Sequence, residues 1–135
     1  MKLRVLLFEQ NPSLQRLLKS FIEGRGHRVQ VMSGEYSCSL HELDACSCPS
    51  EKPCADAVII NTRMATIENM QILVDQAKKG CKLPRQNKAI MNTVFTESLE
   101  QSVRDLGFST IKQPLKMAEI AGWLNECGER AKLDV

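Results

Sequence analysis

The chain has 135 residues, a length typical of a single domain with its own hydrophobic core. Hydrophobic residues make up 43% and charged residues 25%, a balance typical of globular proteins that excludes general disorder. Eighteen Lys and Arg against sixteen Asp and Glu leave a net charge of +2, without the basic excess that is typical of nucleic-acid binding. No apolar run approaches the roughly 20 residues of a membrane-spanning helix, and the first apolar stretch is too short for a secretory signal. We therefore expect one cytoplasmic domain over residues 1–135, with reduced cysteines, that binds neither nucleic acid nor a membrane.

The first part of the chain alternates between apolar runs and a helical repeat. Residues 3–8 form a short apolar run followed by a polar cluster, which is typical of a strand buried on both faces. Asn11 is an expected N-cap, and Pro12 suits the first helical position. Apolar residues then recur at helical spacing until two glycines end the pattern: Leu14, Leu17, Leu18, Phe21 and Ile22. Residues 27–32 alternate between apolar and polar, which predicts a second strand.

The same alternation of strand and helix continues to the end of the chain. Residues 33–55 are irregular, with a short helix predicted over 36–43 and a cysteine-rich loop over 44–55. A third buried strand is expected over 57–60, ending at Asn61. The remaining predicted elements are helices near 67–77, 99–106 and 117–127 and strands over 88–94 and 108–111. The predicted strands and helices alternate five times along the chain. This order predicts an α/β fold, with a five-stranded parallel sheet and helices on both faces.

The functional residues of such an open sheet gather at the carboxyl ends of its strands. Here those ends are residues 9–11, 61–63, 92–94 and 112–114. Asp56 precedes Asn61 by five positions, so on a strand the two side chains point to opposite faces. We therefore expect Asp56 to begin the strand and to lie outside any site at its end.

In their order and spacing, these strand ends resemble the receiver domain of two-component response regulators. The resemblance extends from residue 2 to about residue 127 and is carried by segments 5–12, 26–29 and 56–64, together with Gly107 and Pro114. It implies a flavodoxin-like receiver fold over the whole of residues 1–135 and a role in signal transduction and phosphorelay.

The chain departs from the receiver pattern at the residues that carry its chemistry. Where the resemblance implies a phosphoacceptor aspartate, the chain has Asn61, and where it implies an acidic pair, the chain has Glu9 and Gln10. Gln113 stands in place of the lysine before the proline, with Lys112 one position earlier. An aromatic position on the fifth strand is held by Ile111, which could equally be a strand residue packed on the last helix. The degenerate pocket implied by the resemblance consists of Glu9, Gln10, Asn61, Thr93, Lys112 and Gln113.

These substitutions remove the chemistry of phosphoryl transfer. An amide is a poor nucleophile, so Asn61 cannot form an acyl phosphate. Magnesium sites are built on carboxylates, and the pocket falls from three negative charges to one, which weakens the attraction for a metal ion. We therefore expect neither aspartyl phosphorylation nor tight magnesium binding, and we expect no enzymatic activity.

The resemblance then implies a pseudo-receiver that acts by protein–protein interaction. Its implied partners are a histidine kinase, a phosphotransfer protein or an output domain, and its implied contact surface is roughly residues 97–126. The alternative is a phosphoaccepting receiver that uses another acidic residue, for which Glu9 is the nearby carboxylate.

The cysteines leave a further alternative open. Cys38, Cys46, Cys48 and Cys54, with His41, place five soft ligands within 17 positions. Structural zinc sites have paired Cys-x(2–4)-Cys knuckles, and this spacing does not match them. A metal- or redox-responsive segment is one interpretation. The other is a loop of reduced cysteines, with Cys81 and Cys127 as small apolar residues in helices.

Overall fold

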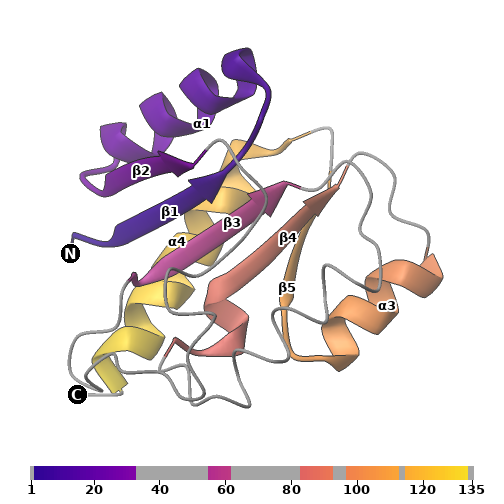
Figure 1. The fold of residues 1–135 in the computed structure, drawn as a ribbon. Coiled ribbons are helices and arrows are strands. Elements are labelled where there is room, and N and C mark those ends of the chain that lie inside the picture. Colours follow the sequence, from indigo (N-terminus) through magenta and orange to yellow (C-terminus); the bar gives the residue numbers. More distant parts are fainter. Residues whose placement is uncertain (1, 33–54, 62–82, 93–96, 113–114, 134–135) are drawn as a thin grey trace, which may run out of the picture.

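The computed structural model describes residues 2–32, 55–61, 83–92, 97–112 and 115–133 (Figure 1). Its strands are β1 (Arg4–Phe8), β2 (Arg28–Met32), β3 (Ala57–Asn61), β4 (Lys88–Asn92) and β5 (Ser109–Lys112). Its helices are α1 (Pro12–Gly24), α3 (Glu97–Asp105) and α4 (Met117–Leu133), with a short 3-10 helix over Arg85–Asn87. The bounds of β3 agree with the predicted strand and its end at Asn61.

The five strands form one parallel sheet in the order β2-β1-β3-β4-β5. Phe8 at the end of β1 pairs with Ile60 of β3, and Asn61 pairs with Met91 of β4. The carboxyl ends of neighbouring strands therefore meet along one edge of the sheet. We refer to this as the carboxyl edge and to the opposite one as the amino edge.

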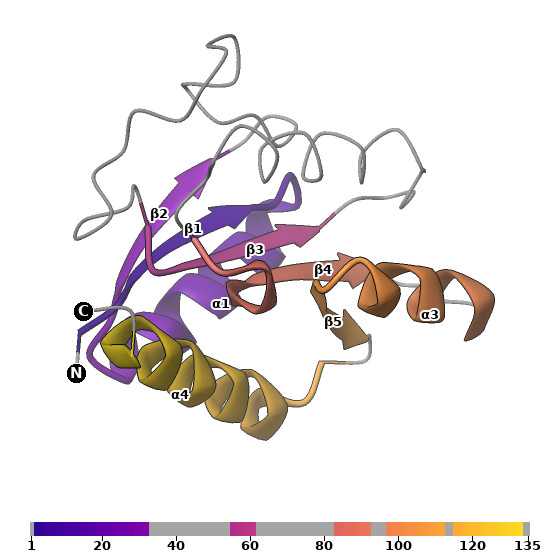
Figure 2. The same cartoon turned by 90° about the horizontal axis from the view of Figure 1, so that it is seen from below.

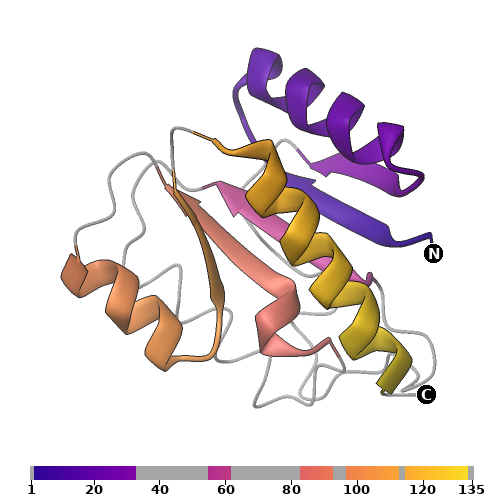
Figure 3. The same ribbon diagram turned by 180° about the vertical axis from the view of Figure 1, so that it is seen from behind.

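Helices cover both faces of the sheet. On one face, α1 and α4 contribute Leu18, Ile22, Ile120 and Leu124 to a core cluster with the β1, β3 and β4 side chains of that face. Figures 2 and 3 show these two helices on the same side of the strands. On the other face, Val103 of α3 joins a second core cluster. The predicted fold class, a parallel α/β sheet of the flavodoxin-like type, is confirmed.

The start of α1 follows the predicted capping pattern, but its apolar stripe is narrower than the sequence indicates. The side-chain oxygen of Asn11 accepts the N–H groups of Ser13 and Leu14 at 2.9 and 3.1 Å. Leu18 and Ile22 are buried, whereas Leu17 is 51% exposed, so the apolar repeat of the sequence is wider than the face of α1 that packs on the sheet. Adjacent positions on a helix differ by 100° in direction, and Leu18 takes the direction that faces the sheet.

Helix α4 is fastened to the turn before β4 by polar contacts at the amino edge. The buried Asn87 side chain donates to the carbonyls of Asp56 and Cys127 at 2.9 and 3.2 Å, and its oxygen accepts from Arg130. Trp123 Nε1 donates to the carbonyl of Gln86 at 2.9 Å. The turn before β4 thus joins β3, β4 and α4.

Several predicted elements fall outside the described residues. These are the helices over 36–43 and near 67–77 and the cysteine-rich loop up to residue 54. Ala55, the last residue of that predicted loop, is described and lies buried in the second core cluster. Among the described helices, none combines the length and apolar character needed to cross a membrane.

Candidate functional site

Glu9 lies at the carboxyl edge directly after β1, and only 4% of it is exposed. Its Oε1 accepts the backbone N–H of Asn11 at 2.9 Å. Because Asn11 also caps α1, the turn that begins the helix fixes the position of the carboxylate. The buried charge therefore sits in a defined orientation against the sheet edge.

Asn61 ends β3, and its side-chain Nδ2–H donates to Oε2 of Glu9. A carboxylate can only accept hydrogen bonds when it is ionised, which places the amide nitrogen, and not the amide oxygen, on the side of Glu9. Both oxygens of Glu9 thus have N–H donors. The pair that the sequence places at neighbouring strand ends is brought into direct contact by the fold.

Gln15 supports this site, although the sequence pattern did not point to it. Its side-chain amide, in the first turns of α1, donates to the main-chain carbonyl of Glu9. The only signal for it in the sequence is its place four residues after Asn11, one helical turn beyond the cap. Gln10 is exposed, and within the described part of the chain it is Gln15, and not Gln10, that supports Glu9.

Lys112 is not brought to this pair. Its Nζ lies 2.7 Å from Oε2 of Glu100, and Glu100 Oε1 lies 2.7 Å from the Arg104 guanidinium. Ile111 packs in the core cluster beneath α4, so the next residue of the strand points to the opposite face, where α3 lies. The placement of Lys112 in the pocket is therefore corrected, and Ile111 is a core residue of β5.

The hydrogen bond from Lys112 is the main reason that the pKa of Glu100 is lowered, and the charges of Arg104 and Lys112 lower it further. Glu100 was not identified from the sequence. Its position four residues before Arg104 on a helix is a recognisable ion-pair spacing, but nothing in the sequence indicates the contact with β5.

Several of the predicted site residues lie in the part of the chain that the structure does not describe. Thr93, Gln113 and the cysteine candidates Cys38, Cys46, Cys48 and Cys54 lie outside the described residues, as do His41 and Cys81. Among the described residues, no group of three or more His, Cys, Asp or Glu side chains could hold a metal ion. The metal or redox role of the cysteine segment stays a prediction.

Cys127 and Asp56 contribute to the fold and lie away from the Glu9–Asn61 pair. Burial raises the pKa of the Cys127 thiol to about 12, so the sulfur stays protonated and behaves as a small apolar group. Asp56 accepts the backbone N–H of Arg4 at 2.8 Å and pairs with its guanidinium at 3.3 Å. These contacts place Asp56 at the amino edge, where β3 begins, as expected.

The Glu9–Asn61 pair does not suit a magnesium ion. Mg²⁺ prefers hard oxygen ligands, and carboxylates supply most of its protein contacts. Here one carboxylate is present, both of its oxygens already accept N–H groups, and the neighbouring side chain directs an amide N–H toward it. The positive ends of two N–H dipoles occupy the positions from which a cation would approach Glu9.

Comparisons with known proteins bear on the fold. No protein-family model and no curated protein matches the chain. Solved structures do match, and receiver domains of response regulators are among them. The fold is that of a receiver domain.

Three of these structures illustrate the similarity. The signal receiver domain of a protein described as a Luxo repressor from Vibrio parahaemolyticus has a TM-score of 0.74 at 15% identity, covering 99% of this chain and 95% of that one. A response regulator receiver protein from Pseudoalteromonas atlantica has a TM-score of 0.71 at 12% identity, covering 95% and 98%. The Francisella response regulator 1452 receiver domain has a TM-score of 0.70 at 15% identity, covering 95% and 98%.

Proposed function

We propose that this chain is a pseudo-receiver, a signalling module with a receiver fold that works by binding protein partners and is not phosphorylated on an aspartate. The observation that carries the proposal is the hydrogen bond from Asn61 to Glu9 at the carboxyl edge. At the end of β3, where the resemblance implies a phosphoacceptor carboxylate, the chain presents an amide whose N–H is directed to its neighbour.

The contacts of Glu9 and Asn61 support a site that does not switch between an unphosphorylated and a phosphorylated state. Transfer of a phosphoryl group needs a free nucleophilic oxygen and positive charge to stabilise the transferred group. Asn61 supplies no such oxygen, and both oxygens of Glu9 are hydrogen-bonded to N–H groups. Lys112, the nearest predicted cation, is held on the other face of the sheet by Glu100. We propose on these grounds that the module is not an enzyme.

Incubation with acetyl phosphate followed by intact-mass measurement tests this proposal. We expect no added phosphoryl group with or without magnesium. A gain of one phosphoryl group would instead support the alternative of a phosphoaccepting receiver. Glu9→Gln is the matched control for that outcome, because it removes the carboxylate that contacts Asn61. Loss of the added mass in Glu9→Gln would assign the phosphoryl group to Glu9.

The proposed partner surface is formed by α3, β5 and α4 over residues 97–126, with a histidine kinase, a phosphotransfer protein or an output domain as partner. Gly122 is exposed on α4, and an added side chain there meets nothing within 4 Å. Gly122→Arg therefore adds bulk to this surface without disturbing the core. Ser20→Arg, at an exposed position of α1, is its matched control.

Purified candidate partners from these three classes can be compared by their affinity for the two variants. We expect Gly122→Arg to weaken binding at least tenfold and Ser20→Arg to leave it unchanged. The reverse pattern would place the contact on α1 and contradict the proposed surface.

A further inference from the structure

A cleft of about 610 Å³ opens at the amino edge, at the end of the sheet opposite to Glu9. The described residues that line it come from the starts of β1 and β2 and from the turn between α1 and β2. Its polar lining includes Lys2, Arg4, His27 and Arg28, and its apolar lining includes Val5 and Val29. The volume lies within the usual range for sites that bind small molecules.

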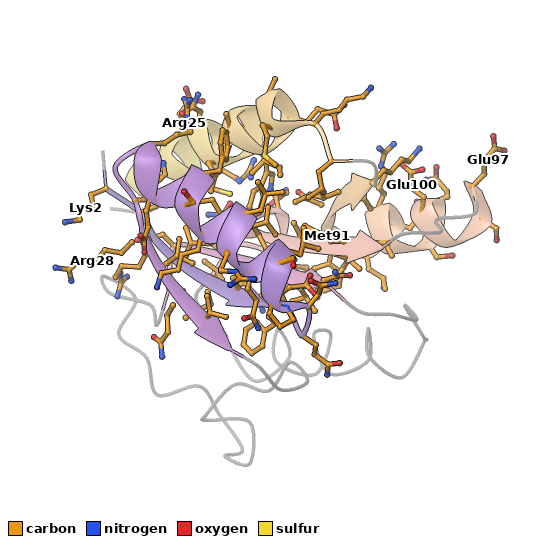
Figure 4. The ribbon with its side chains drawn as sticks, turned by 90° about the horizontal axis from the view of Figure 1, so that it is seen from above. Lys2, Arg25, Arg28, Met91, Glu97 and Glu100 are labelled. Carbon is orange, nitrogen blue, oxygen red and sulfur yellow. The ribbon has the colours of Figure 1, made fainter. Side chains whose placement is uncertain are left out.

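The cleft has an excess of positive charge. Arg4 is paired with Asp56, whereas Lys2 and Arg28 form no ion pair within the described part of the chain. Among the described lining residues the one acidic side chain is Glu23, which faces Lys19 at 3.9 Å. Figure 4 shows Lys2 and Arg28 at the same end of the molecule. An anion entering the cleft therefore meets cations whose charge is not already neutralised.

His27 adds a buried hydrogen-bond donor to this charge. Only 8% of the residue is exposed, and its Nδ1 accepts the backbone N–H of Leu3 at 3.1 Å. The neutral ring must therefore carry its proton on Nε2. Among the described contacts, this Nε2–H has no protein acceptor. Buried donors are normally satisfied, so an unpaired N–H in the wall of a cleft indicates an acceptor that comes from outside the chain.

The surroundings of His27 keep its imidazole neutral, so that Nε2–H remains a hydrogen-bond donor. Burial lowers the pKa of His27, and the charge of Arg25 lowers it further. The ring is therefore neutral near pH 7, with the acceptor on Nδ1 and the donor on Nε2. The same positive potential that disfavours an imidazolium favours an anion.

We propose that this cleft binds a phosphate-bearing small molecule, whose phosphate oxygens accept from His27 Nε2–H and pair with Arg28 and Lys2. Phosphate oxygens take several charge-assisted hydrogen bonds at once, and a guanidinium is suited to two of them. The partly exposed side chain of Leu6, on the same face of β1 as Arg4, provides contact for the organic part of the molecule. This site is separate from the Glu9–Asn61 pair and does not depend on the function proposed for that edge.

Titration of the full chain with inorganic pyrophosphate, followed by amide NMR at constant ionic strength, tests the proposal. We expect saturable shifts at Lys2 and at residues 26–30. We expect Arg28→Gln to weaken binding roughly tenfold, because it removes a charge-assisted contact. Arg16→Gln, at an exposed arginine of α1 outside the cleft, is the matched control and should bind as the parent chain does. Parallel titrations with AMP and glucose 6-phosphate distinguish a nucleotide from a sugar phosphate.

His27→Asn tests the buried donor separately. An Asn oxygen can still accept from Leu3 N–H, whereas the Nε2–H is removed, so we expect weaker binding in a folded protein. Unchanged binding in this variant would overturn the role assigned to His27. Equal affinities for Arg28→Gln and Arg16→Gln, identical shifts with sodium acetate, or the absence of saturable shifts at millimolar pyrophosphate would each overturn the site.

Discussion

Glu100 of α3 and Lys112 of β5 form an ion pair in which the carboxylate oxygen lies 2.7 Å from the ammonium nitrogen. Glu100 is largely buried, whereas the Lys112 side chain is 59% exposed. Arg104 contacts the other carboxylate oxygen, so one acid holds two cations and joins the helix to the last strand. The Glu100 carboxylate therefore adds a charged contact between α3 and β5 to the apolar packing of Val103.

Lys112→Met should lower the urea midpoint of unfolding at pH 7, because it leaves Glu100 with one cation. The pKa of Glu100 is held below its ordinary value of 4.5 in the folded protein. Its stabilising contribution is therefore complete above that value and is lost as the pH falls through the lowered pKa. We expect the difference between the variant and the parent chain to shrink at acid pH.

Lys116→Met is the matched control for this variant, because its contact with Glu119 is long and exposed. A loss of stability that is the same at neutral and acid pH would show that Lys112 acts by packing and not by charge.

His27 should make the stability of the chain fall in mildly acid solution. Its pKa is lowered from 6.5 by burial and by Arg25. The unfolded chain therefore binds a proton more readily than the folded one, and stability decreases as the pH falls below 6.5 toward the lowered pKa. Above 6.5 the contribution is constant. Unfolding by urea at a series of pH values should show a shallower slope between pH 7 and 5 for His27→Asn than for the parent chain.

Asn61→Asp should convert the site at the carboxyl edge into one that responds to magnesium. It replaces a donor to Glu9 with a second carboxylate, so we expect a loss of about 1–3 kcal/mol in the free energy of unfolding without metal. Two carboxylates at this distance attract a divalent cation, and magnesium should restore part of the loss in Asn61→Asp but not change the parent chain.

The double variant Glu9→Gln with Asn61→Asp is the control, because it exchanges the amide and the carboxylate and keeps one donor and one acceptor. We expect it to be more stable than Asn61→Asp alone. An equal response of the parent chain and Asn61→Asp to magnesium would contradict the account of this site.

Two glycines should respond in opposite directions to replacement by alanine. Gly122 lies in the interior of α4 with open space around it, so Gly122→Ala should stabilise the chain by about 0.5–1 kcal/mol. Gly107 ends α3 with φ of +92°, and an added Cβ would lie 3.3 Å from Arg85 Cδ. Gly107→Ala should therefore destabilise the chain by roughly 1 kcal/mol or more. Thermal unfolding of both variants checks the two signs, and a stabilised Gly107→Ala would contradict the strain at that turn.

The strands were the most predictable part of this fold. The run at residues 57–60 is apolar at every position, and β3 has the predicted bounds because a strand covered on both faces buries each of these side chains. The resemblance placed Glu9 and Asn61 in one pocket, and parallel strands bring their carboxyl ends to one edge, although the hydrogen bond between the two side chains was not predicted. Neither inference required knowledge of the distant contacts.

The predictions that were wrong concern the direction of single side chains. Lys112 was placed in the pocket, but a shift of one residue on a strand reverses the face, and the burial of Ile111 decides that shift. Leu17 belongs to the apolar repeat of the sequence but is exposed, because the stripe of α1 that contacts the sheet is narrower than that repeat. Gln15 and Glu100 were missed because their contacts join segments that the sequence does not place together.

The hydrogen bonds of the Asn87 side chain make the sheet depend on α4, which is synthesised after the strands. The Asn87 side chain is buried, and one of its hydrogen bonds goes to the Cys127 carbonyl on α4. Until α4 has been synthesised and has docked, this amide has neither that acceptor nor Arg130 as a donor. A nascent chain that ends before residue 117 therefore leaves the Asn87 amide with the Asp56 carbonyl as its partner and without either contact from α4. Ribosome-bound chains should acquire protease resistance only after α4 has left the exit tunnel.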